Sequence, residues 1–164
     1  MNGHGPGTDV IDAPAIAALL PHGAGLSLLD AVIAWDERTL RATSRRHLRA
    51  AHPLRAAQAR SERAQNAPGE VSAVQLIEYA AQAAAVHIGL LAPRRQAIRG
   101  GVLALVRDVQ LHAVTIARVD ADLHIDVARR GGLPAGFLYE FVATVAGTTV
   151  AAGKLGIVLR AAAR

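Results

Sequence analysis

The pattern of apolar and polar residues predicts a short helix near the N-terminus, followed by a hairpin. Asp12 precedes an alanine- and leucine-rich run that ends at Leu20, directly before Pro21. Aspartate is favoured at a helix N-cap, proline is tolerated in the first turn, and the residue before a proline disfavours helix. The apolar run 26–35, a polar triplet and the alternating residues 40–43 then predict two paired strands.

A long apolar helix is the clearest element of the chain. Residues 71–91 carry an apolar stripe that includes Val74 and Ile77, and the remaining faces are apolar as well. A helix that is apolar nearly all round belongs in the interior of a domain. The polar stretch 45–69 before it has little periodicity, which predicts a long loop or a loosely helical insert.

The chain after residue 100 alternates between apolar and polar positions with period two, which predicts strands. Glycine-containing turns are predicted at 130–132 and 146–148, and the last strand at 150–159. A hairpin, a buried helix and an antiparallel meander of about four strands together indicate an α+β domain, with a curved antiparallel sheet wrapped around one long central helix. Because the end strands of such a sheet leave backbone donors unpaired, we also expect a dimer with a second copy or a similar chain.

A chain of 164 residues has the length of one domain. We predict a disordered tail over 1–9 and a single domain over 10–164, with the polar insert at about 45–69. Hydrophobic residues make up 52% of the chain and cysteine is absent, which excludes a disordered, disulfide-stapled or cysteine-metal protein. The N-terminus lacks the basic and apolar regions of a signal peptide, and the apolar stretch 79–92 is shorter than the roughly twenty residues that span a bilayer. These features predict a soluble, cytoplasmic protein without a membrane partner.

Arginine carries the positive charge of the chain. There are 18 basic residues against 13 acidic ones, a net charge of +5, and Lys154 is the single lysine. Arginine serves nucleic acid, an anionic membrane surface or an acidic protein. Aromatic residues form 3% of the chain and do not interleave with the arginines as they do in a base-stacking surface, so we expect no nucleic-acid partner.

Glu78 is the residue that points most strongly to chemistry. It lies within the apolar helix, where an ionised carboxylate without a partner is costly. Gln82 follows one turn later and shares its face. Two alternatives remain at this point: Glu78 is solvated at the helix surface, or it is a general acid or base in a dry cavity.

His52 is the candidate partner of Glu78, because a loop histidine that faces a buried carboxylate forms an acid-base pair. His47, slightly earlier in the chain, is an equal alternative, whereas His22 and His87 are expected to be structural. No set of histidine and acidic residues has metal-ligand spacing, so we predict no metal. No phosphate loop, dinucleotide fingerprint or serine elbow is present, so we predict no cofactor either.

Two segments of the chain resemble a known enzyme family. Residues 19–30, with their Leu-Pro-His motif, are similar to the N-terminal motif of the hotdog-fold 3-hydroxyacyl-(acyl carrier protein) dehydratases. Residues 76–83 are similar to the start of their central helix, with its Glu-x-x-x-Gln core at Glu78 and Gln82. The resemblance covers roughly 19–159 and is strongest to the divergent branch associated with aryl-polyene and related pigment pathways.

The resemblance implies a dimeric enzyme that acts on an acyl group carried by phosphopantetheine, which enters a tunnel at the protomer interface. In the family, a loop histidine of one protomer and the helix glutamate of the other remove the α-proton and expel the 3-hydroxyl as water, which leaves a trans-2-enoyl thioester. A backbone N–H at the start of the helix polarises the thioester carbonyl. Carried over by position, Glu78 is the acid-base carboxylate, and His52 is the candidate for the other catalytic residue. Gln82 and Ala73 are substrate-binding residues, Ala73 through its N–H.

The chain departs from the family pattern near the histidine. The family's histidine lies in a His-Phe-Pro type motif much closer to the glutamate, whereas residues 55–69 of the polar insert separate His52 from Glu78 here. Ser72-Ala73 also replaces the family's Pro-Gly. Two alternatives therefore stay open: a non-catalytic acyl-binding subunit of a heterodimeric dehydratase, and a hotdog acyl-thioesterase.

Many arginines flank the two ends of the predicted central helix, where the family's acyl tunnel opens. An acidic acyl carrier protein would dock there, and Arg94 and Arg95 would bind its phosphopantetheine phosphate. A plain solvated surface is the alternative. The flanking arginines are Arg45, Arg46, Arg49, Arg55, Arg60, Arg63, Arg94, Arg95 and Arg99.

Overall fold

The computed structural model describes residues 10–20, 24–49, 71–92, 101–116 and 120–160. The predicted N-terminal tail and most of the predicted polar insert lie outside these ranges.

Within the described ranges, the helical elements are few and the strands are many. In chain order the helices are α1 (Ala13–Leu19), η1 (Ala24–Leu26), η2 (Arg46–Leu48), η3 (Ala73–Gln75) and α3 (Leu76–Leu91). The strands are β1 (Ile11–Asp12), β2 (Ala31–Trp35), β3 (Thr39–Ser44), β4 (Val71–Ser72), β5 (Gly101–Leu111), β6 (Thr115–Ile116), β7 (Leu123–Leu133), β8 (Gly136–Val145) and β9 (Thr148–Leu159).

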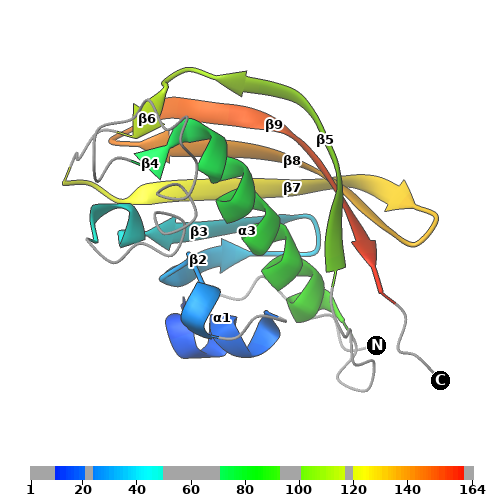
Figure 1. The fold of residues 1–164 in the computed structure, drawn as a ribbon. Helices are drawn as coiled ribbons and strands as arrows, with labels where there is room; N and C mark the ends of the chain where they lie inside the picture. The colour runs from blue at the N-terminus through cyan, green and yellow to red at the C-terminus, as the bar shows by residue number, and fades with distance from the viewer. Residues whose placement is uncertain (1–9, 21–23, 50–70, 93–100, 117–119, 161–164) are drawn as a thin grey trace.

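Seven of the strands form one antiparallel sheet in the order β1-β2-β3-β7-β8-β9-β5. The sheet curves around the long helix α3, and α1 lies beside the lower end of that helix (Figure 1). A second sheet consists of the short strands β4 and β6. An antiparallel sheet wrapped around one long helix is the hotdog architecture, so the predicted α+β fold is confirmed.

Small side chains allow the sheet to approach α3 closely. Ala80, Ala83 and Ala84 are fully buried, and α3 packs against strands β3, β7, β8 and β9 and against α1. By length and composition alone, the segment Ala73–Leu91 is also long and apolar enough to cross a membrane. More than half of that stretch is buried inside the fold, which explains why its residues are apolar.

Two polar residues define the first elements as the sequence predicts. Asp12 caps α1, because its Oδ1 accepts a hydrogen bond from the Ala15 N–H at 3.0 Å. Asp36 closes the β2–β3 hairpin, where its Oδ1 accepts bonds from the N–H groups of Arg38 and Thr39, each at 2.7 Å. The predicted short helix and hairpin are therefore confirmed.

The predicted 71–91 helix is correct from Leu76 onward and wrong before it. Val71 and Ser72 form β4 and pair with Ile116 and Thr115 of β6, and the following three residues form the 3₁₀ helix η3. Apolar periodicity does not separate a buried strand from the first turn of a buried helix, and the partner strand lies far along the chain.

One predicted turn is confirmed and one is misplaced. Ala146 and Gly147 have φ values of 48° and 77°, which is the conformation that a tight two-residue hairpin requires, and they join β8 to β9. The predicted turn at 130–132 lies instead inside β7, where Gly131 pairs with Leu138 and Gly132 with Phe137.

The sequence predicts that the strand after the helix begins a meander of consecutive strands, and this prediction is wrong for β5. Strand β5 pairs with β9 and forms one edge of the seven-stranded sheet, while β7, β8 and β9 form the meander. Sequence order alone cannot distinguish these arrangements. The two outer strands of the meander, β7 and β9, can each accept a further antiparallel neighbour.

His87 is a packed residue of the core, as the sequence predicts. Its Nε2 lies 2.8 Å from the Asp36 carbonyl oxygen, so this nitrogen carries the proton and donates it. Its Nδ1 lies 2.9 Å from the Tyr139 hydroxyl and accepts from it. Burial lowers the pKa of His87, against the opposing effect of the bond to Asp36, and burial also raises the pKa of Tyr139.

This network predicts that lowering the pH destabilises the fold. Below the ordinary histidine pKa of about 6.5, the unfolded chain binds a proton at residue 87 that the folded chain excludes, so the free energy of unfolding decreases as pH decreases until the depressed pKa is passed. His87→Gln should lower the free energy of unfolding at neutral pH by about 1–3 kcal/mol, because buried partners lose hydrogen bonds. The variant should also show a flatter pH dependence just below the ordinary histidine pKa of about 6.5. Urea unfolding at several pH values measures both effects, and equal slopes for variant and wild type would contradict the prediction.

Candidate active site

Gln82 joins helix α3 to the segment that precedes strand β2. Its Oε1 accepts a hydrogen bond from the Leu28 N–H at 2.8 Å, and its Nε2 donates to the Leu26 carbonyl at 3.0 Å. The same Nε2 donates to Glu78 Oε1 at 3.2 Å. An N–H donor on one side and a carbonyl on the other leave the amide group a single orientation. The side chain is buried, and three partners keep it in place.

Glu78 lies half-buried on the first turns of α3, one turn before Gln82. The sequence left two alternatives for Glu78, a solvated surface carboxylate or an acid-base group in a dry cavity. The structure lies between them, because the carboxylate is partly covered and has a fixed hydrogen-bond donor. A carboxylate offers about four acceptor positions. The bond from Gln82 orients Glu78 while its remaining positions can still take up or release a proton.

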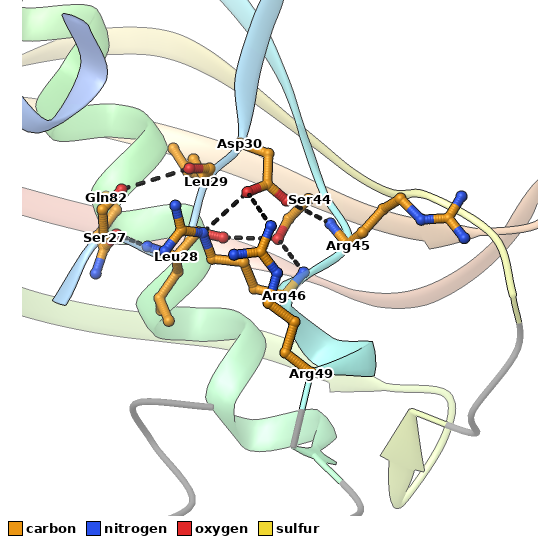
Figure 2. Close-up of polar contacts among 9 residues, drawn as sticks. All are labelled: Ser27, Leu28, Leu29, Asp30, Ser44, Arg45, Arg46, Arg49 and Gln82. Atoms are coloured by element: carbon orange, nitrogen blue, oxygen red, sulfur yellow. Dashed lines mark hydrogen bonds and ion pairs between the residues drawn. The ribbon is translucent and has the colours of Figure 1, made fainter. Parts of the chain in front are cut away.

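A buried serine and a partly exposed aspartate-arginine cluster lie beside this segment (Figure 2). Ser44, the last residue of β3, donates from Oγ to the Leu28 carbonyl at 2.7 Å and accepts from the Arg46 N–H at 3.0 Å. Asp30 accepts from the Arg45 N–H at 2.8 Å and from Arg46 Nε at 3.0 Å. These bonds hold the short helix η2 against the end of the β2–β3 hairpin.

His47 is the one histidine of the two proposed partners that the structure describes. It lies on η2, directly after Arg46, and 3% of its surface is exposed. His52 lies outside the described residues, as do His22, Arg94 and Arg95. The predicted roles of these residues therefore stay predictions, and the structure brings together Glu78, Gln82 and the segments that carry Ser44 and His47.

The N–H predicted to polarise a substrate carbonyl is already used in the structure. The Ala73 N–H donates to the Val114 carbonyl at 2.9 Å, next to the pairing of β4 with β6. Ala73 is fully buried. The predicted role of Ala73 stays a prediction, and it requires the N–H to leave Val114 before it binds a thioester.

Three of the arginines predicted to form a docking surface are paired with acidic residues. Arg45 contacts Asp120 and also Asp122, at 3.2 Å. Arg46 and Arg49 approach Asp30 at 3.0 and 3.5 Å. The charge of these three arginines is compensated by acidic residues of the same chain. Their ion pairs therefore favour a structural role around η2 over a free basic surface. The other six flanking arginines lie outside the described residues.

Sequence reasoning did not identify Ser44 or Asp30. Both contact partners across the hairpin, and the Ser44–Leu28 bond joins residues 16 positions apart. A serine at the end of a strand and an aspartate after an apolar run are ordinary residues at such places. Their one sequence signal is that Asp30 interrupts the apolar run 26–35 and that Ser44 directly follows the predicted strand 40–43.

The fold and the site together define a class of protein. A curved antiparallel sheet around a helix that carries the linked Glu78 and Gln82 side chains is the arrangement of a hotdog protein of the dehydratase type. The chain matches the family model ApeP-like, described as ApeP dehydratase, over residues 14–161. It belongs to this ApeP-like dehydratase family, which confirms the resemblance to a divergent branch of hotdog dehydratases.

Solved structures show the same fold at low sequence identity. A chain of the dehydratase heterocomplex ApeI:P from Xenorhabdus doucetiae is 20% identical, with a TM-score of 0.73 over 89% of this chain and 91% of that one. A protein from Pseudomonas aeruginosa is 14% identical, with a TM-score of 0.55 over 91% and 96% of the two chains. An HP0420 homologue from Helicobacter felis is 10% identical, with a TM-score of 0.51 over 81% and 79%. No curated protein sequence matches the chain significantly.

Proposed function

We propose that this protein dehydrates a 3-hydroxyacyl thioester to the trans-2-enoyl thioester. The observation that carries the proposal is the half-buried carboxylate of Glu78, held by Gln82 on the central helix of a dehydratase-type hotdog fold. The proposed substrate is an acyl group on the phosphopantetheine of an acyl carrier protein, in fatty-acid or pigment biosynthesis. The proposed place of reaction is the cytoplasm.

The reaction needs one proton to leave C2 and one to reach the departing oxygen. A base takes the α-proton, the C2–H electrons form the C2=C3 double bond, and the C3–O bond breaks as the hydroxyl receives a proton and leaves as water. The net step is neither oxidation nor reduction. Glu78 fits one of the two proton-transfer roles, and a histidine, His47 or His52, is proposed for the other.

Glu78→Gln should nearly abolish dehydration. The amide has about the same size as the carboxylate but cannot exchange a proton, and general acid-base groups contribute about 10²- to 10⁴-fold to rate. We therefore expect a fall in kcat within that range, with the melting temperature close to wild type. The measurement is mass-spectrometric detection of the enoyl product from a 3-hydroxyacyl carrier-protein substrate.

Glu140→Gln is the matched control for this variant, because Glu140 lies on β8 in an exposed ion pair with Arg130. It should keep wild-type kcat. Undiminished water elimination by folded Glu78→Gln protein would contradict the proposal. Release of a free 3-hydroxy acid in place of an enoyl thioester would identify the alternative activity, a hotdog thioesterase.

Binding of the carrier protein is proposed to use the basic segment that follows α3. In the sequence, Arg94 and Arg95 follow shortly after Leu91, the last residue of α3. Carrier proteins are acidic, and a phosphate attracts arginine through charge-assisted bonds. These two arginines are the proposed contacts, whereas the paired arginines of η2 are not.

The double variant Arg94→Ala/Arg95→Ala should raise KM several-fold for the carrier-bound substrate and leave KM unchanged for a pantetheine thioester that lacks phosphate. The difference between variant and wild type should shrink in high salt, because screening weakens exposed charge pairs. Arg130→Ala, which removes an exposed arginine from the β-sheet, is the control. Equal KM values for carrier-bound substrate in all three proteins would argue for a plain solvated surface.

A second hotdog chain is the proposed structural partner, and β5 is the proposed contact. Strand β5 is 11 residues long, forms one edge of the sheet and has large apolar residues exposed. The other edge, β1, has two residues. A long exposed apolar edge strand is a template for pairing with another chain. The exposed apolar residues of β5 are Val102, Leu105, Val106 and Leu111.

Val106→Lys should therefore weaken self-association of the purified protein. Val106 is 41% exposed on the edge strand, and Val142, which is 38% exposed on the interior strand β8, provides the control Val142→Lys. Analytical ultracentrifugation should show a dimer for wild type and Val142→Lys and a monomer for Val106→Lys. A dimer that resists Val106→Lys would place the contact elsewhere.

A non-catalytic subunit of a heterodimeric dehydratase is the second candidate. The observation in its favour is the structural similarity to a chain of the ApeI:P heterocomplex. Activity of the isolated, homodimeric protein would argue against this candidate. Activity that appears only after addition of a second hotdog chain, and that persists in Glu78→Gln, would support it.

A further inference from the structure

The Ser44 hydroxyl is completely buried and uses both of its hydrogen-bonding roles. It donates to the Leu28 carbonyl at 2.7 Å and accepts from the Arg46 N–H at 3.0 Å (Figure 2). A serine hydroxyl has one donor hydrogen, and the Leu28 carbonyl takes it. The side chain therefore bridges two backbone groups from different segments.

These two bonds continue a line of contacts that begins at the proposed catalytic carboxylate. Gln82 Nε2 donates to Glu78, and Gln82 Oε1 accepts from the Leu28 N–H. The carbonyl of the same Leu28 accepts from Ser44, which in turn accepts from Arg46. The next residue of the chain is His47. The line therefore runs from Glu78 on α3 to the histidine-bearing helix η2.

The hairpin itself does not depend on the Ser44 hydroxyl. The Asp30 N–H donates to the Thr43 carbonyl at 2.9 Å, and β2 pairs with β3 through backbone bonds. Asp30 also accepts from the Arg45 N–H. Because these contacts hold the end of the hairpin, loss of the hydroxyl removes the bond that joins η2 directly to Leu28, while the strands stay paired and the Asp30 contacts to Arg45 and Arg46 remain.

We propose that Ser44 is a positioning residue of the active site, which sets the place of the His47 turn relative to Glu78. This inference rests on the proposed dehydratase function. Acid-base chemistry requires both groups at defined positions around the substrate, and a displacement of about 1 Å costs about 100-fold in rate. Ser44 itself touches no reacting atom in this proposal and acts through Leu28 and Arg46.

The test compares variants that remove or keep the hydroxyl. Ser44→Ala should lower kcat at least tenfold, with KM for the carrier-bound substrate within about twofold of wild type. Ser44→Thr, which keeps a hydroxyl at the same atom position, should recover most of the lost kcat. Thermal unfolding and circular dichroism establish that each variant is folded. If Ser44→Ala does not fold, Ser44→Cys replaces it, because a thiol has similar size and is a weak hydrogen-bonding group.

Ser27→Ala is the matched control. Ser27 is also buried, at 1% exposure, and its hydroxyl approaches the Leu29 carbonyl at 3.4 Å, outside the line of contacts from Glu78 to η2. Its kcat should equal that of wild type. Equal losses of kcat in Ser27→Ala and Ser44→Ala, or a loss that Ser44→Thr does not recover, would overturn the positioning role in favour of a general structural one.

Combination with Glu78→Asp separates the remaining outcomes. In that variant the carboxylate is already displaced, so adding Ser44→Ala should lower kcat by a smaller factor than it does in wild type. The same factor in both backgrounds would overturn the coupling.

If Glu78→Gln is fully active, the proposed function fails. If Glu78→Gln is inactive while folded Ser44→Ala keeps wild-type kcat, only the inference about Ser44 fails.

Discussion

The enclosure of α3 by the curved sheet is the constraint on which the rest of this structure depends. The strands approach the helix backbone because Ala80, Ala83 and Ala84 occupy little space on its buried surface. Larger residues at these places would push the sheet outward, and overpacking of this kind is destabilising. The high apolar content of the helix is thus a requirement of its position inside the domain.

Any polar group on such a helix must find a partner inside the fold. Gln82 and His87 meet this requirement in two different ways. His87 bonds to Tyr139 and to the Asp36 carbonyl, which ties the helix to the sheet and to the hairpin turn. Gln82 bonds to the backbone around Leu28 and reaches back to Glu78. The same physical demand therefore produces a structural network near one end of α3 and an oriented carboxylate near the other.

Part of the positive charge of the chain is neutralised by acidic residues of the same chain. The η2 arginines are compensated by Asp30, Asp120 and Asp122, so their role in the structure is to fasten the turn that carries His47. A net positive charge in the sequence does not reveal this, because pairing depends on which acidic residues the fold brings near. The basic residues left to meet an acidic partner are accordingly a smaller set than composition indicates.

Several elements were predictable because their signals are local. The Asp12 cap, the hairpin around Asp36 and the turn at Ala146 and Gly147 each depend on residues within a few positions of one another. The extra residues of the predicted helix, 71–75, and the edge position of β5 were not predictable in this way. They depend on pairing with β6 and β9, which are distant in the sequence. The periodicity of apolar residues does not indicate which strand is the partner.

The sequence by itself determined that an apolar helix would be enclosed by antiparallel strands, and that Glu78 and Gln82 would lie on one helix face. Helical periodicity and the burial of apolar surface are sufficient for both conclusions. The tertiary structure alone decided what Gln82 and Ser44 bond to and how Glu78 is thereby linked to η2. Those bonds join residues 54 and 16 positions apart, and such contacts exist only after packing has brought the segments together.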